Sequence, residues 1–306
     1  MGTPAFAVPS LERVVNAGHE VLAVYTQPDR PRGRGGKMAA SPVKEMAVRL
    51  GIEVRQPERV RRPEVVQELA AFKTDVMVVV GYGQIIPQSI IDLPRHGIIN
   101  VHASLLPKYR GAAPIQWAIA NGEAETGVTT MRIDAGLDTG DMLLKDRTAI
   151  GHEEDALQLG ERLSNMGAEL LTRTLDGIEA GAIAPQPQDE AQATHAPLLH
   201  KEDGLIDWQQ TAGAIFNRCR GFLPWPGTWT RLREHMFHIW KSRVADEVMS
   251  GSPGSIMTDR HRMFVACGDN TALQLLEVQL EGRRRVSAEA FLNGWKPLPG
   301  EELGQP

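Results

Sequence analysis

The first two thirds of the chain alternate between short apolar runs and longer segments in which apolar residues recur every three to four positions. The apolar runs predict strands, and the amphipathic segments predict helices that pack against them. Strands separated by helices of this length are typical of an α/β fold with a doubly wound parallel sheet. The predicted strands are 20–26, 53–56, 75–83, 97–103 and 125–133, and the predicted helices are 41–51, 63–73, 113–122 and 153–181.

The beginning of the chain departs from this alternation. Gly2, Thr3 and Pro4 form a turn that leads directly into a helical segment. In a doubly wound sheet such a turn follows a strand, yet no strand precedes Met1. We therefore expect the first strand to be missing, either because the domain lacks it or because the true start lies upstream.

The pattern changes after residue 183. Three prolines and little periodicity in 184–203 predict a linker. Beyond it, short strands broken by Gly, Pro and Asp predict a small β-barrel, which divides the chain into domains 1–183 and 204–306. We interpret Trp225, Trp229 and Trp240 as barrel core, because large aromatic side chains dominate small cores. The predicted barrel strands are 236–245, 253–258, 262–267 and 272–280.

Composition narrows the class of protein. The chain has 306 residues, a net charge of −5 and 42% hydrophobic residues, as expected for a globular protein with a sizeable core. Cys219 and Cys267 lie far apart and outside any CxxC pair, which favours reduced thiols in the cytoplasm. No apolar run is long enough to span a bilayer, and no signal peptide is visible. A cytoplasmic protein with no membrane partner is expected.

Candidate chemistry lies at the end of the run 97–103. Asn100 and His102 are two positions apart, so in a strand their side chains point to one face and Val101 points to the other. Both lie near the carboxyl end of the strand, where open α/β sheets bind ligands. From spacing alone, Asn100 could be only a turn former and His102 only a core group.

The loop after strand 125–133 adds carboxylates to this edge. An amide, an imidazole and a nearby carboxylate suit acyl-group transfer, because the first two can donate to an oxyanion and the third can accept a proton from the nucleophile. No protein nucleophile is needed. Ser104 lacks a G-x-S-x-G context, and we interpret it as capping the turn. The loop carboxylates are Asp134, Asp138 and Asp141.

Other cofactor chemistry finds little support in the sequence. The stretch "GYGQII" (81–86) lacks the third glycine of a dinucleotide fingerprint, which disfavours an NAD-dependent oxidoreductase. The stretch "GRGGKM" (33–38) lacks the P-loop spacing. His152, His195 and His200 show no paired ligand spacing, so no metal is assigned.

Three stretches together resemble the methionyl-tRNA formyltransferases, within the 10-formyltetrahydrofolate-dependent formyltransferase family. They are "INVHASLLPKYRGAAPIQWAI", "TGVTTMRIDAGLDTGDML" and "TQPDRPRGRGGKMAASPVK". The resemblance runs from Gly2 to about residue 297. The N-x-H-x-S-L-L-P and G-L-D-T-G-D stretches set the reaction class, whereas the basic loop and the C-terminal domain point to the tRNA enzymes.

The resemblance implies a Rossmann-like formyltransferase domain followed by an OB-like tRNA-binding domain. It implies 10-formyltetrahydrofolate as formyl donor, the methionyl amine of initiator tRNA as acceptor, and no metal. Asn100, His102 and Asp138 match the family's catalytic triplet. The folate-binding residues implied are Tyr82, Gly83, Ile85, Ser104, Leu105, Leu106, Pro107 and Asp134.

The run "PDRPRGRGGK" (28–37) is strongly basic and rich in glycine. By composition alone it fits a solvated loop as well as an RNA phosphate contact. In the related enzymes this loop enters the acceptor stem, and Arg34 matches its functional arginine. The tRNA-binding candidates are Arg30, Arg32, Arg34, Lys37 and, in "GRRRV", Arg283, Arg284 and Arg285.

Two other functions stay open at this point. One is a related transformylase that uses the same donor on a small amine, against which the basic loop and the added barrel argue. The other is a non-catalytic RNA- and folate-binding protein, against which the intact Asn100, His102 and Asp138 argue. The expected protein is a monomeric cytoplasmic enzyme of translation initiation.

Overall fold

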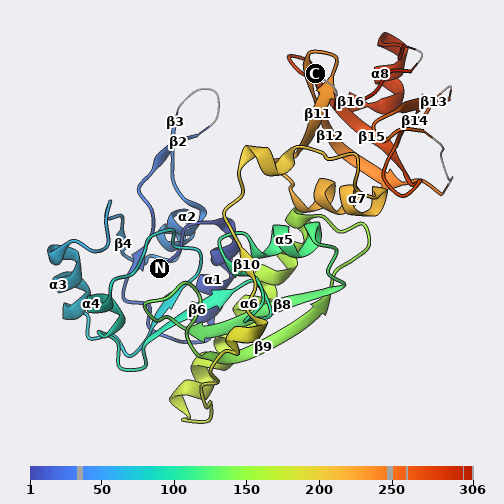
Figure 1. The fold of residues 1–306 in the computed structure, drawn as a ribbon. Coiled ribbons are helices and arrows are strands. Elements are labelled where there is room, and N and C mark those ends of the chain that lie inside the picture. Colours follow the sequence, from blue (N-terminus) through green and yellow to red (C-terminus); the bar gives the residue numbers. More distant parts are fainter. Residues whose placement is uncertain (33–36, 247–250, 260, 299, 305–306) are drawn as a thin grey trace. The chain divides into compact units, whose positions relative to one another are not determined.

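The computed structural model describes residues 1–32, 37–246, 251–259, 261–298 and 300–304. The chain forms two compact units (Figure 1). Unit one comprises Met1–Pro114, Glu125–Ala149 and Gly160–Ala196, and unit two comprises Ile115–Ala124, Ile150–Leu159 and Pro197–Pro306. None of the helices in the described ranges combines the length and the apolar composition that crossing a bilayer requires.

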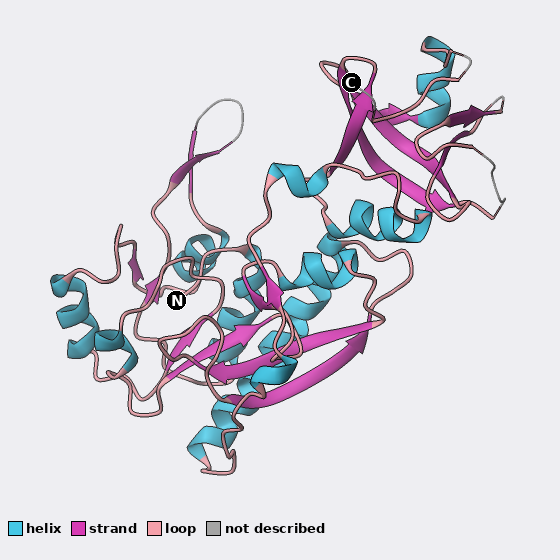
Figure 2. Cartoon of the chain, viewed as in Figure 1, coloured by secondary structure: helices cyan, strands magenta, loops and turns pink. Residues whose placement is uncertain are grey.

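Unit one is built on a mixed four-stranded sheet. Its order is β5 (Met77–Val79), β6 (Ile98–His102), β8 (Glu125–Arg132) and β9 (Met142–Ala149). β5 and β6 are parallel, whereas β8 is antiparallel to both β6 and β9. In Figure 2, β8 and β9 are the two long neighbouring arrows. Three strand pairs accompany it: β1 (Val24–Tyr25) with β4 (Val54–Arg55), β2 (Arg30–Arg32) with β3 (Lys37–Ala39), and β7 (Arg110–Gly111) with β10 (His195–Ala196).

Two hydrophobic clusters cover the two faces of this sheet. Ile99 and Val101 pack with Val43 of α2 and with Leu171 of α6, whereas Ile98 packs on the other face with Leu69 of α3. The alternation along β6 follows from the period of two in a strand. The helices of unit one are η1 (Ala5–Ala7), α1 (Val8–Asn16), α2 (Pro42–Arg49), α3 (Pro63–Ala71), α4 (Gln88–Ile91), α6 (Ala156–Glu179, from Gly160 onward) and η2 (Glu190–Gln192). From Ile115 onward, α5 (Pro114–Ala120) belongs to unit two.

The expected α/β architecture is confirmed, but the expectation of a parallel sheet is wrong for β8 and β9. Residues 103–124 contain a helix, yet they leave and re-enter the sheet at the same end, because His102, the last residue of β6, pairs with Thr129 in the middle of β8 and Ile99 pairs with Arg132 at its end. Residues 133–141 then join β8 directly to β9, and strands joined in this way are antiparallel. β9 was not predicted from the sequence, because polar residues alternate along it and the predicted strands were continuous apolar runs.

The first residues of the chain lie between β1 and β5, which do not pair with each other. The Gly2 N–H donates to the Tyr25 carbonyl at 3.0 Å, and the Val80 N–H donates to the Met1 carbonyl at 2.9 Å. The Met1 amine donates to the Val78 carbonyl at 2.6 Å. Further along the same gap lies a cavity of about 770 Å³, lined by β1, β5 and both apolar side chains, such as Leu171 and Leu175, and polar ones, such as His19 and Asp75. Met1 and Gly2 therefore bridge β1 and the end of β5.

We predict that five apolar residues, such as Val-Val-Ile-Val-Phe, added before Met1 raise the unfolding temperature by about 10 °C. The added residues would fill the cavity and pair with the free edges of β1 and β5. Thermal unfolding measured by circular dichroism tests this. A Gly-Ser extension of equal length is the control, and equal melting temperatures for the two extensions would contradict the prediction.

The same extension should change how stability depends on pH. Burial lowers the pKa of the Met1 amine to about 5 from its ordinary value of 8.0. Between these values the unfolded chain binds more protons than the folded chain, so stability should rise as the pH increases from about 5 to 8. Extension converts the Met1 amine into a backbone amide, so this contribution to the rise of stability with pH should disappear.

Unit two holds a six-stranded antiparallel sheet. Its order is β11 (Thr228–Leu232), β12 (His235–Val244), β15 (Ala272–Leu280), β14 (Met263–Ala266) and β13 (Ile256–Thr258), with β16 (Val286–Ser287) beside β15. One face of this sheet forms a core with Phe216 of α7 (Ala212–Gly221) and Phe291 of α8 (Ala288–Gly294). A 3-10 helix, η3 (Lys201–Gly204), precedes α7. The short antiparallel strands match the expectation for this part of the chain.

The interpretation of Trp225, Trp229 and Trp240 as barrel core is wrong. Trp225 is 57% exposed, and Trp229 and Trp240 are only partly buried outside the core cluster. Lys201 lies over the Trp229 ring at 5.7 Å, and Arg285 lies over the Trp240 ring at 5.3 Å. The rings are therefore stabilised by contacts with cations outside the core.

Candidate active site

Asn100 and His102 lie on β6 with their side chains on the same face of the sheet. Their neighbours Ile99 and Val101 belong to the core cluster on the opposite face, as the alternation predicts. Asn100 lies in register between Val79 of β5 and Met131 of β8. His102 is 6% exposed, and Asn100 is partly buried. The rigid centre of the sheet therefore sets the distance between the amide and the imidazole.

Asp138 lies near these two residues, but its loop follows an antiparallel strand and not the parallel strand that was expected. Because β8 is antiparallel, the loop 133–141 begins beside Ile98 and folds back over the sheet. Asp138 has a positive φ of 54°, a conformation that Asp tolerates better than most residues. A Cβ at Gly140 would lie 2.0 Å from the Arg132 carbonyl oxygen, so the loop can close only with glycine there.

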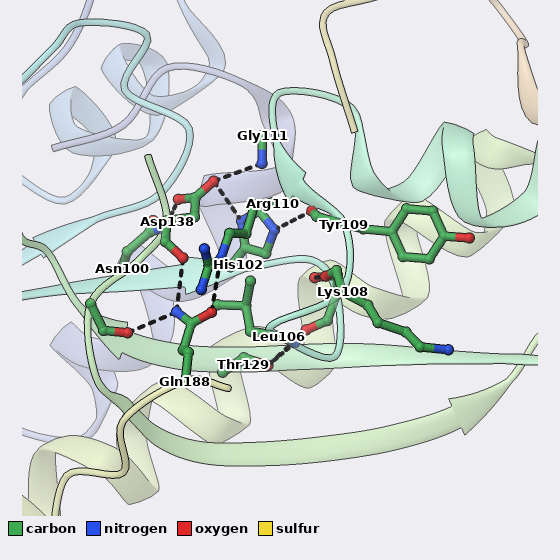
Figure 3. A network of polar contacts seen from close by, with 12 residues as sticks. Asn100, His102, Leu106, Lys108, Tyr109, Arg110, Gly111, Thr129, Asp138 and Gln188 are labelled. Atoms are coloured by element: carbon green, nitrogen blue, oxygen red, sulfur yellow. Dashed lines mark hydrogen bonds and ion pairs between the residues drawn. The ribbon is translucent and has the colours of Figure 1, made fainter. Parts of the chain in front are cut away.

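The three side chains meet at the site shown in Figure 3. The Asn100 Nδ2 donates to Asp138 Oδ1 at 3.4 Å, and His102 Nδ1 lies 3.7 Å from Asp138 Oδ2. The Asp138 side chain is 16% exposed, so the carboxylate is accessible from one side. The structure thus brings together an amide donor, an imidazole and a carboxylate, whose catalytic roles stay a prediction.

The short segment 109–111 supports both His102 and Asp138. The Tyr109 carbonyl lies 2.9 Å from His102 Nε2 and can only accept, so Nε2 carries a proton and Nδ1 faces Asp138. The Gly111 N–H donates to Asp138 Oδ2 at 2.9 Å. Gly111 has a φ of 124°, and a Cβ there would lie 2.5 Å from the Ala196 carbonyl oxygen. The tautomer of His102 and the position of Asp138 therefore depend on the same three residues.

The predicted folate-binding turn follows β6 directly. The Ser104 hydroxyl donates to the Lys108 carbonyl at 2.6 Å, which is the turn-capping contact expected of it. Thr129 of β8 donates to the Ser104 carbonyl and accepts the Leu106 N–H. Lys145 donates to the Leu106 carbonyl at 2.7 Å, and burial lowers the pKa of this lysine. Leu105 and Pro107, the other members of the turn, are partly buried.

Two neighbouring loops carry the other predicted folate contacts. Ile86 and Ile133 both pack against the core cluster that contains Tyr82, which places loop 81–87 beside the start of loop 133–141. Tyr82 is buried, and burial raises the pKa of its hydroxyl to about 12. Exposed positions on these loops are Gly83, Ile85 (92% exposed), Asp134 and Leu137 (66% exposed). Exposed apolar side chains next to polar groups are typical of a ligand site.

The predicted tRNA contacts fall in two places. Arg30, Arg32 and Lys37 lie on the β2–β3 hairpin, and Arg34 lies outside the described residues. Arg283 and Arg284 are exposed just before β16. Arg285 is paired with Glu277 as well as lying over Trp240. None of these contacts with RNA is tested by the structure.

Sequence reasoning missed three residues that surround the triplet. Arg110, Gln188 and Glu190 form a connected set of hydrogen bonds next to Asp138. Two of them lie in the segment expected to be a linker, and no local pattern pairs them with position 110. Within the described part of the chain, no group of three or more His, Cys, Asp or Glu side chains is arranged to hold a metal ion.

Comparison with known proteins gives a consistent result along the whole chain. Residues 1–175 match the "Formyl transferase" family model, and residues 198–296 match "Formyl transferase, C-terminal domain". A methionyl-tRNA formyltransferase of Solibacter usitatus (strain Ellin6076) is 62% identical over 305 residues, covering 100% of this chain and 97% of that protein. One of Koribacter versatilis (strain Ellin345) is 54% identical over 305 residues, covering 99% and 97%.

Solved structures extend the likeness in fold. The sugar 3N-formyl transferase WlaRD superimposes with a TM-score of 0.69 at 19% identity, covering 92% of this chain and 97% of that one. An N-formyltransferase from Helicobacter canadensis gives a TM-score of 0.68 at 19% identity, covering 90% and 96%. At this identity the likeness concerns the fold, whereas the two bacterial relatives are 62% and 54% identical over nearly the full length of this chain. The chain therefore belongs to the formyl transferase family and, within it, to the methionyl-tRNA formyltransferases.

Proposed function

We propose that this protein transfers the formyl group of 10-formyltetrahydrofolate to the methionyl α-amine of initiator tRNA. Its full-length identity of 62% to a methionyl-tRNA formyltransferase carries this conclusion. The amide, imidazole and carboxylate gathered at Asn100, His102 and Asp138 provide the chemistry that such a transfer needs. The reaction supports translation initiation, and we place the enzyme in the cytoplasm as a monomer.

The site fits the formyl donor. Loops 81–87 and 133–138 carry the exposed apolar side chains Ile85 and Leu137, which can contact a pteridine ring, and the turn Ser104–Pro107 follows His102 of β6 directly. When bound, the folate supplies the formyl carbon that the amine attacks. We propose that Tyr82, Gly83, Ile85, Asp134 and the turn residues Ser104, Leu105, Leu106 and Pro107 hold it.

The protein residues then have two roles, to stabilise the negative charge that develops on the oxygen and to accept the proton that leaves the amine. Asn100 Nδ2, only 3.4 Å from Asp138, can turn its N–H toward the oxygen on which negative charge develops. His102 keeps Nε2–H on the Tyr109 carbonyl, so only Nδ1 can exchange a proton with the site. Asp138 accepts the proton that leaves the amine, directly or through His102. No covalent intermediate on the protein is required.

The direct test measures formyl transfer from 10-formyltetrahydrofolate to charged initiator tRNA by the purified chain. We expect turnover that depends on both substrates. A folded protein that formylates only a small amine would shift the assignment to a related transformylase. A protein that binds folate and RNA but transfers no formyl group to either acceptor would be assigned instead as a non-catalytic RNA- and folate-binding protein.

We propose that the basic hairpin and Arg283, Arg284 and Arg285 contact the tRNA. Replacing Arg34 by Ala should lower kcat/KM for Met-tRNA by roughly 10- to 100-fold, because an arginine contact to the nucleic acid is lost. The KM for the folate should stay unchanged. Arg61→Ala, which removes an exposed arginine outside the hairpin, is the matched control. Equal effects of the two changes, or none at Arg34, would remove the hairpin from the proposal.

A further inference from the structure

Residues 194–196 lie directly beside the active site although they are distant from it in sequence. The Thr194 hydroxyl accepts the Tyr109 N–H at 2.9 Å, and the Thr194 carbonyl accepts the Arg110 N–H at 2.8 Å. β10 then pairs with β7 in a parallel register that places Ala196 opposite Gly111. The segment that supports His102 and Asp138 is therefore itself supported by residues 194–196.

Gln188 connects the same stretch of chain to the Asp138 loop (Figure 3). Its Nε2 donates to the carbonyl oxygens of Asp138 and Gly140, each at 2.8 Å. Its Oε1 accepts from Arg110 Nε at 3.0 Å. A guanidinium N–H can only donate and a carbonyl can only accept, so the Gln188 amide has a single orientation that satisfies all three groups. Arg110 therefore determines which end of the amide faces the loop.

Glu190 fixes Arg110 in turn. Its two carboxylate oxygens accept from Nη1 and Nη2 of Arg110 at 2.9 and 2.7 Å. The Arg110 side chain is 3% exposed, whereas that of Glu190 is 72% exposed. The hydrogen bond to Glu190 raises the pKa of Arg110, so the buried guanidinium keeps its charge. Bidentate pairs of this kind define a geometry as well as an energy.

We propose that Arg110 and Gln188 are positioning residues for formyl transfer, holding the loop so that the Asp138 carboxylate faces Asn100 and His102. This inference rests on the proposed function. Gln188 acts on the backbone carbonyls of Asp138 and Gly140 directly, and Arg110 acts on them through its hydrogen bond to Gln188. Their loss should therefore misplace the carboxylate, and the main effect should fall on kcat and not on KM.

The test begins with Gln188→Leu, which keeps the approximate size of the side chain and removes both of its hydrogen-bonding ends. We expect kcat for Met-tRNA formylation to fall roughly 10- to 100-fold, because small displacements of a reacting group have effects of this size. The KM for each substrate should stay within about twofold. Gln188→Glu is the second variant, since it keeps the acceptor for Arg110 but turns an oxygen toward two carbonyl oxygens. It should lower kcat in the same way.

Gln192→Leu is the matched control, because Gln192 bonds to Asp189 and not to the loop. A readout that needs no turnover is amide hydrogen exchange at Gly111, whose N–H donates to Asp138 Oδ2. Lower kcat with faster Gly111 exchange in both Gln188 variants, and neither change in Gln192→Leu, supports positioning. Unchanged kcat, an effect confined to KM, or unchanged Gly111 exchange overturns it. If the wild-type chain does not formylate Met-tRNA, the proposed function fails, and Gly111 exchange still decides whether Gln188 positions the loop.

Discussion

Replacing Asp138 by Asn should lower the rate of formyl transfer by about 10²- to 10⁴-fold, the range that a positioned general base contributes. The change keeps the shape of the side chain, and its oxygen can still accept the Gly111 N–H. It removes the group that takes the proton from the attacking amine. In the wild type, a carboxylate oxygen of Asp138 lies 3.7 Å from His102 Nδ1, and the substitution replaces this charged group by a neutral amide. Folate binding should change by less than about twofold, because Asp138 acts on the amine.

Single-turnover formylation of Met-tRNA, together with a separate folate-binding titration, tests this expectation. Asp92→Asn makes the same substitution at the exposed end of α4 and should leave both measurements unchanged. Near-normal rates in Asp138→Asn would show that the proton leaves by another route. A loss of folate affinity equal to the loss of rate would mean that Asp138 binds the donor.

Asn100→Ala should lower kcat by about 10²- to 10³-fold, as the loss of an oxyanion donor does in other acyl-transfer sites. Asn100 is held at the centre of the sheet in register between Val79 and Met131, so the backbone that carries its amide is fixed. The donor is lost, but the backbone of β6 keeps its pairing and the fold should survive.

The decisive measurement for Asn100 is the division of the effect between kcat and KM. A donor used mainly in the transition state lowers kcat with little change in KM. Asn165→Ala on the exposed side of α6 is the matched control. If Asn100→Ala raised KM for the folate while kcat stayed normal, Asn100 would be a binding residue for the ground state.

The common orientation of Asn100 and His102 could be predicted from the sequence, because it depends only on the period of two in a strand. The proximity of Asp138 was expected for the wrong reason. The pattern of strands and helices predicted its loop at the carboxyl end of a parallel strand, whereas β8 is antiparallel and the loop folds back over the sheet. Strand direction depends on how distant segments pair, and no local pattern in 125–133 records it.

Arg110 and Gln188 could not be predicted from the sequence for a related reason. They lie 78 positions apart, and the segment around Gln188 has neither the periodicity nor the composition of a regular element. The error at Trp229 has another physical origin. Along β11 the chain buries Thr228 and Thr230 and leaves the larger Trp229 on the opposite face. Side-chain size predicted the core less well than the alternation of the strand.

The long sequence separation between Arg110 and its partners has a consequence for the synthesis of the protein. Asn100, His102 and Asp138 all leave the ribosome well before Gln188, Glu190 and Thr194. Until those later residues have emerged, the Asp138 loop lacks the donor for its two carbonyls, and segment 109–111 lacks its paired strand. A nascent chain that ends before residue 188 can thus contain the complete triplet and still have an unassembled active site. Catalytic competence then arises late in translation, when residues 188–196 pair with segment 109–111 and with the Asp138 loop.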